Sequence, residues 1–188
     1  MKRTMKNKLI IGLFITGLIL FGWMNLFYLP EKENLQAEEM LRQLDPETHD
    51  FSKVLVYENL YMGNNSNNAH LFQSLPLQNY LNGFEQDPDR FLLIVNYKDL
   101  SDVSPRQVQQ SVIYNTTAAF VLIKNLEQIE LRLPNENFLV NRSNVESVLG
   151  NLDELLDPPL FEKEVQQRLK TEEIEDWLDQ YIQVSKEG

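Results

Sequence analysis

The chain has 188 residues, no cysteine and a formal net charge of −11. All 28 acidic residues follow Pro30, so the part of the chain beyond it carries about −15, the wrong sign for binding nucleic acid or an anionic lipid surface. Without cysteine, neither disulfides nor a lipidated N-terminal cysteine is available, so an exported domain needs a sufficient hydrophobic core.

The N-terminal segment has the pattern of a membrane anchor. Four basic residues fall within residues 1–8, and an uncharged, mostly apolar run covers residues 9–29. About 20 helical residues cross the hydrocarbon core of a bilayer, and basic flanks stay on the cytoplasmic side. The pattern predicts a single-pass protein of the cell membrane, with a cytoplasmic tail (1–8), a transmembrane anchor (9–29) and an extracytoplasmic remainder.

A cleaved signal peptide is the alternative interpretation of the same segment. It requires a shorter apolar core, followed closely by a small-x-small cleavage site. The nearest candidate, Leu35-Gln36-Ala37, lies well beyond the apolar run and begins with a large residue. The sequence therefore favours an uncleaved anchor.

Residues 30–50 are polar and acidic, with a few apolar residues at helical spacing that end at Asp45-Pro46. We interpret them as a stalk, with His49 solvated at its end. Residues 51–188 have the size of one ordinary domain and contain no internal repeat or flexible linker.

The first half of this domain alternates predicted strands with turns. Residues 54–57 are rich in β-branched residues and predict a first strand, followed by a loop over 59–68 that is rich in asparagine. A short helix is expected over 69–75, stopped by Pro76. Residues 80–84 and 91–97 predict a hairpin whose turn contains Asp87-Pro88-Asp89.

A long helix follows, with Ser104 as N-cap, Pro105 at the first helical position and Gln107 closing a capping box. Its apolar stripe runs to about Leu126, which predicts the centre of the core. Residues 128–133 and 138–140 predict a second hairpin, and Ser143 and Glu146 a second capping box. The predicted fold is α+β: an antiparallel sheet of about five strands with one long helix packed on it, and C-terminal helices.

Little in the sequence predicts catalysis or a cofactor. Ser66 and His70 are four residues apart, but no nucleophile-elbow motif surrounds Ser66. His49 and His70, the only two histidines, do not form a zinc motif, and the acidic residues around Pro88 lack the calcium-loop pattern. We expect no metal, no cofactor and no enzymatic activity.

Three stretches together carry a resemblance to a known family. They are Tyr61-x-Gly63-Asn64-Asn65-Ser66 with Leu75-Pro76-Leu77, the strand that ends at Val95-Asn96-Tyr97, and the helix around Asn115-Thr116-Thr117. This pattern resembles a domain of unknown function from Gram-positive bacteria. The resemblance implies an N-terminal membrane anchor, and relatives attached to membrane proteins of the antibiotic-sensing metallopeptidase type. In that family an aspartate is common where Asn64 stands here.

The leading functional hypothesis is a membrane-anchored, sensor-like module that binds a protein partner or a small cell-envelope ligand. Loops placed by a rigid scaffold often carry function, so the predicted contact residues lie in the asparagine-rich loop: Tyr61, Gly63, Asn64, Asn65, Ser66 and Asn68. One alternative is a small cell-envelope hydrolase that uses Ser66 or clustered acids. Another is a structural subunit that docks on a membrane protein through exposed Trp177, Leu178 and Tyr181.

Overall fold

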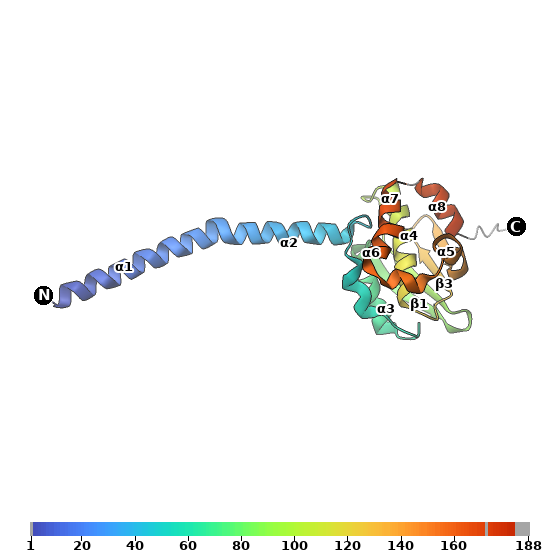
Figure 1. The fold of residues 1–188 in the computed structure, drawn as a ribbon, viewed down its shortest axis with the longest axis horizontal. Helices are drawn as coiled ribbons and strands as arrows, with labels where there is room; N and C mark the ends of the chain where they lie inside the picture. The colour runs from blue at the N-terminus through green and yellow to red at the C-terminus, as the bar shows by residue number, and fades with distance from the viewer. Residues whose placement is uncertain (1, 172, 183–188) are drawn as a thin grey trace. The chain divides into compact units, whose positions relative to one another are not determined.

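A computed structural model describes residues 2–171 and 173–182. The chain divides into two compact units, one ending at Leu41 and one beginning at Arg42 (Figure 1). The first unit is helical throughout: α1 (Lys2–Trp23), one π-helical turn η1 (Met24–Tyr28) and α2 (Leu29–Leu44) follow without a break. The helix ends directly before Asp45-Pro46, as the sequence predicted, because a proline disfavours helical geometry in the residue before it.

Apolar side chains of this first helical unit are exposed. Leu26 is 72 % exposed, and the other large apolar residues from Leu13 to Tyr28 are exposed as well. The helix is long and apolar enough to cross a membrane, and none of its most apolar stretch is buried within the protein. The core helix of a soluble domain would be mostly buried, so this segment is a candidate anchor or signal sequence instead.

The domain contains a four-stranded mixed sheet in the order β1-β2-β3-β4. The strands are β1 (Leu81–Asp87), β2 (Leu92–Tyr97), β3 (Gln128–Arg132) and β4 (Asn137–Asn141). β1 pairs antiparallel with β2 and β3 with β4, whereas β2 and β3 are parallel. The α+β class is confirmed, but the prediction of about five antiparallel strands is wrong: the sheet has four, and its central pair is parallel.

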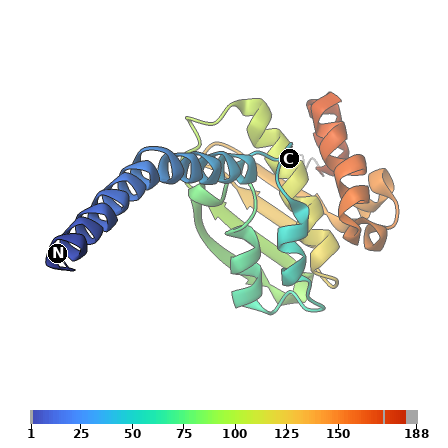
Figure 2. The same ribbon diagram turned by 60° about the vertical axis from the view of Figure 1, so that its left-hand side comes forward.

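The helix α4 (Pro105–Leu122) explains the parallel pair. It returns the chain across the sheet, so that β3 starts at the same end as β2 (Figure 2). Ser104 caps it, accepting a hydrogen bond from the Gln107 N–H at 3.2 Å, as predicted. Fourteen of its eighteen residues are buried, as expected of a helix enclosed on several sides.

Most polar side-chain atoms buried along α4 are bonded locally or to neighbouring segments, although the Asn115 amide oxygen has no partner among the described residues. Thr116 and Thr117 each donate to a carbonyl one turn earlier, at 2.7 Å in both cases. The Asn115 amide nitrogen donates to the Pro76 carbonyl at 2.8 Å. These bonds allow a polar stretch to occupy the centre of the domain, because a buried polar group without a partner is costly.

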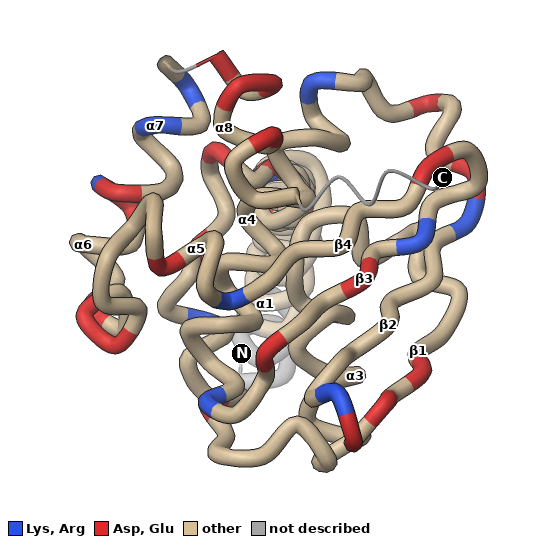
Figure 3. Tube along the Cα trace, turned by 90° about the vertical axis from the view of Figure 1, so that its right-hand side faces the viewer, with Lys and Arg blue, Asp and Glu red and all other residues tan. Residues whose placement is uncertain are grey.

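Side chains of β3 alternate between the core and the other face of the sheet, whereas the residues from Leu92 to Val95 of β2 are all buried. On β3, Ile129 and Leu131 are fully buried, while Glu130 and Arg132 lie on the other face. Arg132 is 2.8 Å from Glu130 and 3.3 Å from Glu85 of β1. Figure 3 shows acidic and basic positions along these strands. One face of the sheet is therefore covered by helices, and the other carries polar side chains beside the buried Leu92 and Ile94 of β2.

The predicted first strand is wrong. Residues 51–57 form a 3₁₀ helix, η2 (Phe51–Tyr57), with Asp50 accepting a hydrogen bond from Ser52 N–H at 3.1 Å. Phe51 and Val54 are buried three residues apart, whereas Val56 is 75 % exposed. Helical spacing of the buried residues overrides the β propensity of Val54-Leu55-Val56, because propensity depends strongly on context.

Shorter helices complete the domain around α4. The capping box at Ser143 is also wrong: β4 runs directly into α5, whose N-cap is Asn141, so Ser143 lies inside the first turn. The expected end of that helix at Gly150 is confirmed. The remaining elements are α3 (Asn65–Phe72), η3 (Gln78–Tyr80), η4 (Pro88–Arg90), α5 (Arg142–Leu149), η5 (Leu152–Leu156), α6 (Pro158–Phe161), η6 (Glu162–Gln166), α7 (Gln167–Thr171) and α8 (Ile174–Tyr181).

His49 is buried, not solvated as expected. It is 2 % exposed, and its Nε2 lies 2.7 Å from the Ser74 carbonyl and its Nδ1 2.6 Å from the Tyr114 hydroxyl. The Gln166 amide donates to the His49 carbonyl at 2.8 Å and to the Pro46 carbonyl at 3.1 Å. The segment that we interpreted as the end of a stalk is thus part of the domain core.

Candidate functional site

The candidate site begins with a short segment that leaves large apolar side chains in solvent. Val56 is 75 % exposed, Leu60 62 % and Tyr61 65 %. We call these residues the apolar triplet. Large exposed apolar groups within six residues of one another, next to a polar loop, are typical of contact surfaces.

Met62 holds the end of this segment in place. Its side chain is 3 % exposed, and its N–H donates to the Asn125 side chain at 2.6 Å. Its carbonyl accepts from the amide nitrogens of Asn68 at 2.6 Å and Gln86 at 2.7 Å. Three side chains from separate parts of the chain therefore fix one residue, so Tyr61 projects from a rigid base.

The backbone before Met62 is fixed to the end of α4. The Asn59 N–H donates to the Leu122 carbonyl at 2.8 Å, and its own carbonyl accepts from Lys124 N–H at 3.0 Å. The Asn59 side chain also donates to the Tyr61 carbonyl at 2.7 Å. These bonds orient the apolar triplet through the core helix of the domain.

Two of the predicted site asparagines have structural roles. Asn64 is the N-cap of α3 and accepts from the Asn67 N–H at 3.2 Å. Asn68 is 1 % exposed; its amide nitrogen bonds Met62, whereas its oxygen has no partner among the described residues. Asn67, another asparagine of the predicted loop, donates to the Tyr57 carbonyl at 2.7 Å.

The other predicted residues lie on the surface. Gly63, Asn65 and Ser66 are exposed, and Tyr61 is the only aromatic one among the six. α3 begins at Asn65, four residues earlier than expected, so Asn65, Ser66 and Asn68 are helical. The structure therefore separates the six residues into an exposed group (Tyr61, Gly63, Asn64, Asn65, Ser66) and one buried support (Asn68).

Electrostatic groups close one side of this surface. Lys124 lies 2.7 Å from Asp153 and 3.6 Å from Glu58. The ammonium group of Lys124 lowers the pKa of Asp153 by hydrogen bonding and by charge. Both acidic partners are substantially exposed, so these pairs orient side chains more than they stabilise the fold.

The residue pair of the hydrolase alternative is exposed on one helix. Ser66 and His70 lie one turn apart on α3, and both side chains face solvent. Within the described part of the chain, no three His, Cys, Asp or Glu residues are placed to hold a metal ion. Catalysis in such a site would need groups converging from several elements, and α3 alone supplies both members of this pair.

Two of the three side chains that fix Met62, those of Asn125 and Gln86, were not predicted from the sequence. Asn125 and Gln86 each reach Met62 across more than twenty residues of sequence. No local pattern identifies such long-range partners. The asparagines next to Met62 did signal that amide side chains bond the backbone of this loop, since amide side chains commonly do so.

Comparison with known proteins agrees with the resemblance described above. Residues 54–146 match the family described as Domain of unknown function (DUF4825), so an uncharacterised family of domains is confirmed for this part of the chain. The match includes the apolar triplet, the asparagine-rich loop, the sheet and α4. No curated protein and no solved structure matches the chain.

Proposed function

We propose that this chain is a single-pass membrane protein whose domain, outside the cytoplasm, recognises a protein partner through the apolar triplet and the adjoining loop. The observation that carries the proposal is the rigid presentation of Tyr61. Its neighbour Met62 is buried and fixed by three side-chain hydrogen bonds, while Tyr61 is 65 % exposed. An aromatic side chain on a fixed backbone loses less conformational entropy on binding than one on a mobile loop, and tyrosine is enriched at the centres of interfaces.

The N-terminal helix supports the membrane part of the proposal. The described apolar side chains from Leu13 to Tyr28 are exposed, and four basic residues precede the apolar run, against one, Lys32, in the ten residues that follow it. The positive-inside rule then orients the N-terminus toward the cytoplasm. The proposed role is recognition without catalysis, as in a sensor-like or adaptor module.

Crosslinking in intact cells tests the proposal. Full-length protein is compared with a Leu60→Ser/Tyr61→Ala variant, in which only exposed side chains change. We expect the wild type to capture a partner that the variant loses, while both proteins melt at the same temperature. The matched control is Phe91→Asn, which removes an exposed aromatic residue elsewhere in the domain. Equal capture by wild type and variant would refute the proposed surface.

A small cell-envelope hydrolase is the second candidate, carried by the proximity of Ser66 and His70 on α3. Ser66→Ala separates the two functions, since it leaves the apolar triplet intact. If the chain is a hydrolase, this substitution abolishes turnover of cell-wall or ester substrates but keeps partner capture. The alternative of a structural subunit required an exposed docking surface formed by Trp177, Leu178 and Tyr181. These side chains are buried in the domain, at 1 %, 4 % and 0 % exposure, so nothing supports that alternative.

A further inference from the structure

A polar cavity lies away from the asparagine-rich loop. It has a volume of about 430 Å³ and is lined by Arg90, Glu127, Gln128, Asn141 and Ser143. These residues come from the turn before β2, the start of β3, the end of β4 and the first turn of α5. The volume lies within the range of roughly 300–1,000 Å³ that is usual for small-molecule sites.

A chain of side-chain hydrogen bonds forms the wall of this cavity. The Arg90 guanidinium donates to the Gln128 oxygen at 2.9 Å, and the Gln128 nitrogen donates to the Asn141 oxygen at 2.8 Å. Asn141 is 7 % exposed, and its amide nitrogen has no partner among the described residues. A buried donor without an acceptor is costly, and an acceptor on a bound molecule removes that cost.

The start of α5 adds donors to the same cavity. Asn141 is the N-cap residue of α5, yet its side chain does not cap the helix, because its oxygen is bonded to Gln128. The Arg142 N–H donates to the Glu127 carbonyl at 2.9 Å, whereas no side chain caps the N–H groups that follow it in the first turn, next to the Ser143 hydroxyl. A helix N-terminus carries partial positive charge and attracts carboxylate groups. With Arg90, one end of the cavity is built to hold an anion.

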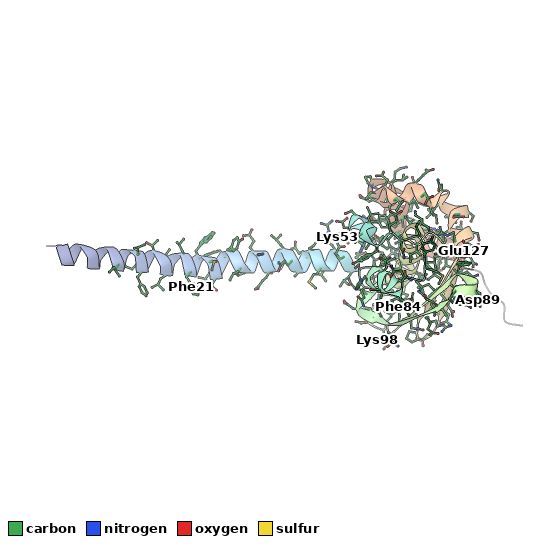
Figure 4. All side chains as sticks on the ribbon, turned by 90° about the horizontal axis from the view of Figure 1, so that it is seen from below. Phe21, Lys53, Phe84, Asp89, Lys98 and Glu127 are labelled. Carbon is green, nitrogen blue, oxygen red and sulfur yellow. The ribbon has the colours of Figure 1, made fainter. Side chains whose placement is uncertain are left out.

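Glu127 gives the cavity a second, opposite charge. Its N–H is bonded to the Phe91 carbonyl at 3.0 Å, which places it next to the Arg90 turn. Glu127 and Asp89 of that turn lie at the same edge of the domain (Figure 4). A carboxylate here would repel a simple anion but would attract a ligand that also carries an ammonium group.

We propose that this cavity binds a small zwitterion, an α-amino acid. The ligand carboxylate bonds Arg90, Ser143 and the free Asn141 amide nitrogen, and the ligand ammonium group pairs with Glu127. Arg90 suits the carboxylate because its planar guanidinium presents several donors at once. This site is separate from the apolar triplet, so it does not depend on the proposed partner surface.

Nuclear magnetic resonance titration of the full-length protein in detergent micelles tests the proposal. The probes are glycine, sodium acetate and methylammonium chloride, each raised to high millimolar concentration at constant ionic strength. We expect glycine to shift the backbone amide signals of Ser143 and Asn144 saturably, with at least tenfold tighter half-saturation than acetate or methylammonium. Absence of a saturable glycine shift at α5 would overturn the proposal.

Variants assign the two halves of the site. Arg90→Gln should weaken glycine binding at least tenfold, and Glu127→Gln should make glycine bind no better than acetate. Both residues are exposed, so the fold should be unchanged, as the amide spectrum away from the cavity reports. Arg132→Gln is the matched control, since Arg132 lies on the same sheet but does not line the cavity. Equal affinity of wild type and Arg90→Gln would also overturn the assignment.

Discussion

At the scale of single residues, the chemistry of His49 follows from its two hydrogen bonds. A backbone carbonyl can only accept, so Nε2, 2.7 Å from the Ser74 carbonyl, carries the proton. The neutral ring then accepts at Nδ1 from the Tyr114 hydroxyl, at 2.6 Å. Burial lowers the pKa of His49, while the Ser74 bond and the charge of Asp50 partly oppose that shift. Lys53 lowers the pKa further.

The first prediction is a loss of stability in mild acid. An unfolded chain takes up the proton near the ordinary pKa of 6.5, whereas the folded chain resists protonation of His49 until lower pH. His49 therefore supports the fold fully above about pH 6.5, and its contribution falls as the pH drops below that value. Thermal melts between pH 8 and pH 5 should show a steeper loss for wild type than for His49→Gln. His70→Gln, which changes an exposed histidine, should keep the wild-type slope.

The second prediction concerns Gly63 in the asparagine-rich loop. Its φ is not positive, and a methyl group at this position would meet no atom within 4 Å. Gly63→Ala should therefore change the free energy of unfolding by less than about 0.5 kcal/mol. Gly150→Ala is the contrast, because φ there is 78°, and it should cost about 1–2 kcal/mol. Urea denaturation of both variants measures the difference; a large loss for Gly63→Ala would show that the loop itself requires glycine.

At the scale of elements, the sequence was sufficient where local chemistry decides the outcome. The start of α4 followed from Ser104, Pro105 and Gln107, since capping is a local interaction. The 3₁₀ helix η2 could not be predicted from local sequence, because Phe51 stacks on Phe161, which lies over a hundred residues away in the chain. The centroids of the two rings are 3.7 Å apart. Local patterns predict an element only when its long-range contacts agree with them.

The third prediction concerns the end of α4, which Arg142 caps from another part of the chain. Its guanidinium donates to the carbonyls of Phe120, Ile123 and Leu126 at 2.7–2.8 Å. Arg142→Met should remove all three bonds, leaving the Ile123 carbonyl with only the 3.2 Å bond from the Leu126 N–H, and lower the free energy of unfolding by about 2–4 kcal/mol. Urea denaturation measures the loss. Arg132→Met removes an exposed arginine and should cost less than about 1 kcal/mol, so similar losses for both would contradict the capping role.

At the scale of the whole molecule, only part of the candidate site could be predicted. Tyr61 was identified from a local motif, and the structure leaves it exposed. Asn68 was chosen by the same motif but is buried as a support for Met62. The polar cavity was missed entirely, because Arg90, Gln128 and Asn141 converge only after the strands pair. Sequence motifs find residues that are adjacent in the chain, while cavities are formed by topology.

The last prediction concerns the membrane topology of the chain. If residues 9–29 are an uncleaved anchor, the protein should remain in the membrane fraction at its full mass of 22.1 kDa. Protease added to intact cells should digest the domain but leave an N-terminal epitope protected. Replacing Lys2, Arg3, Lys6 and Lys8 by glutamine should reduce the fraction in this orientation, because those charges set it. A shorter, released domain would instead identify the apolar segment as a cleaved signal sequence, and the recognition surface would then belong to a secreted protein.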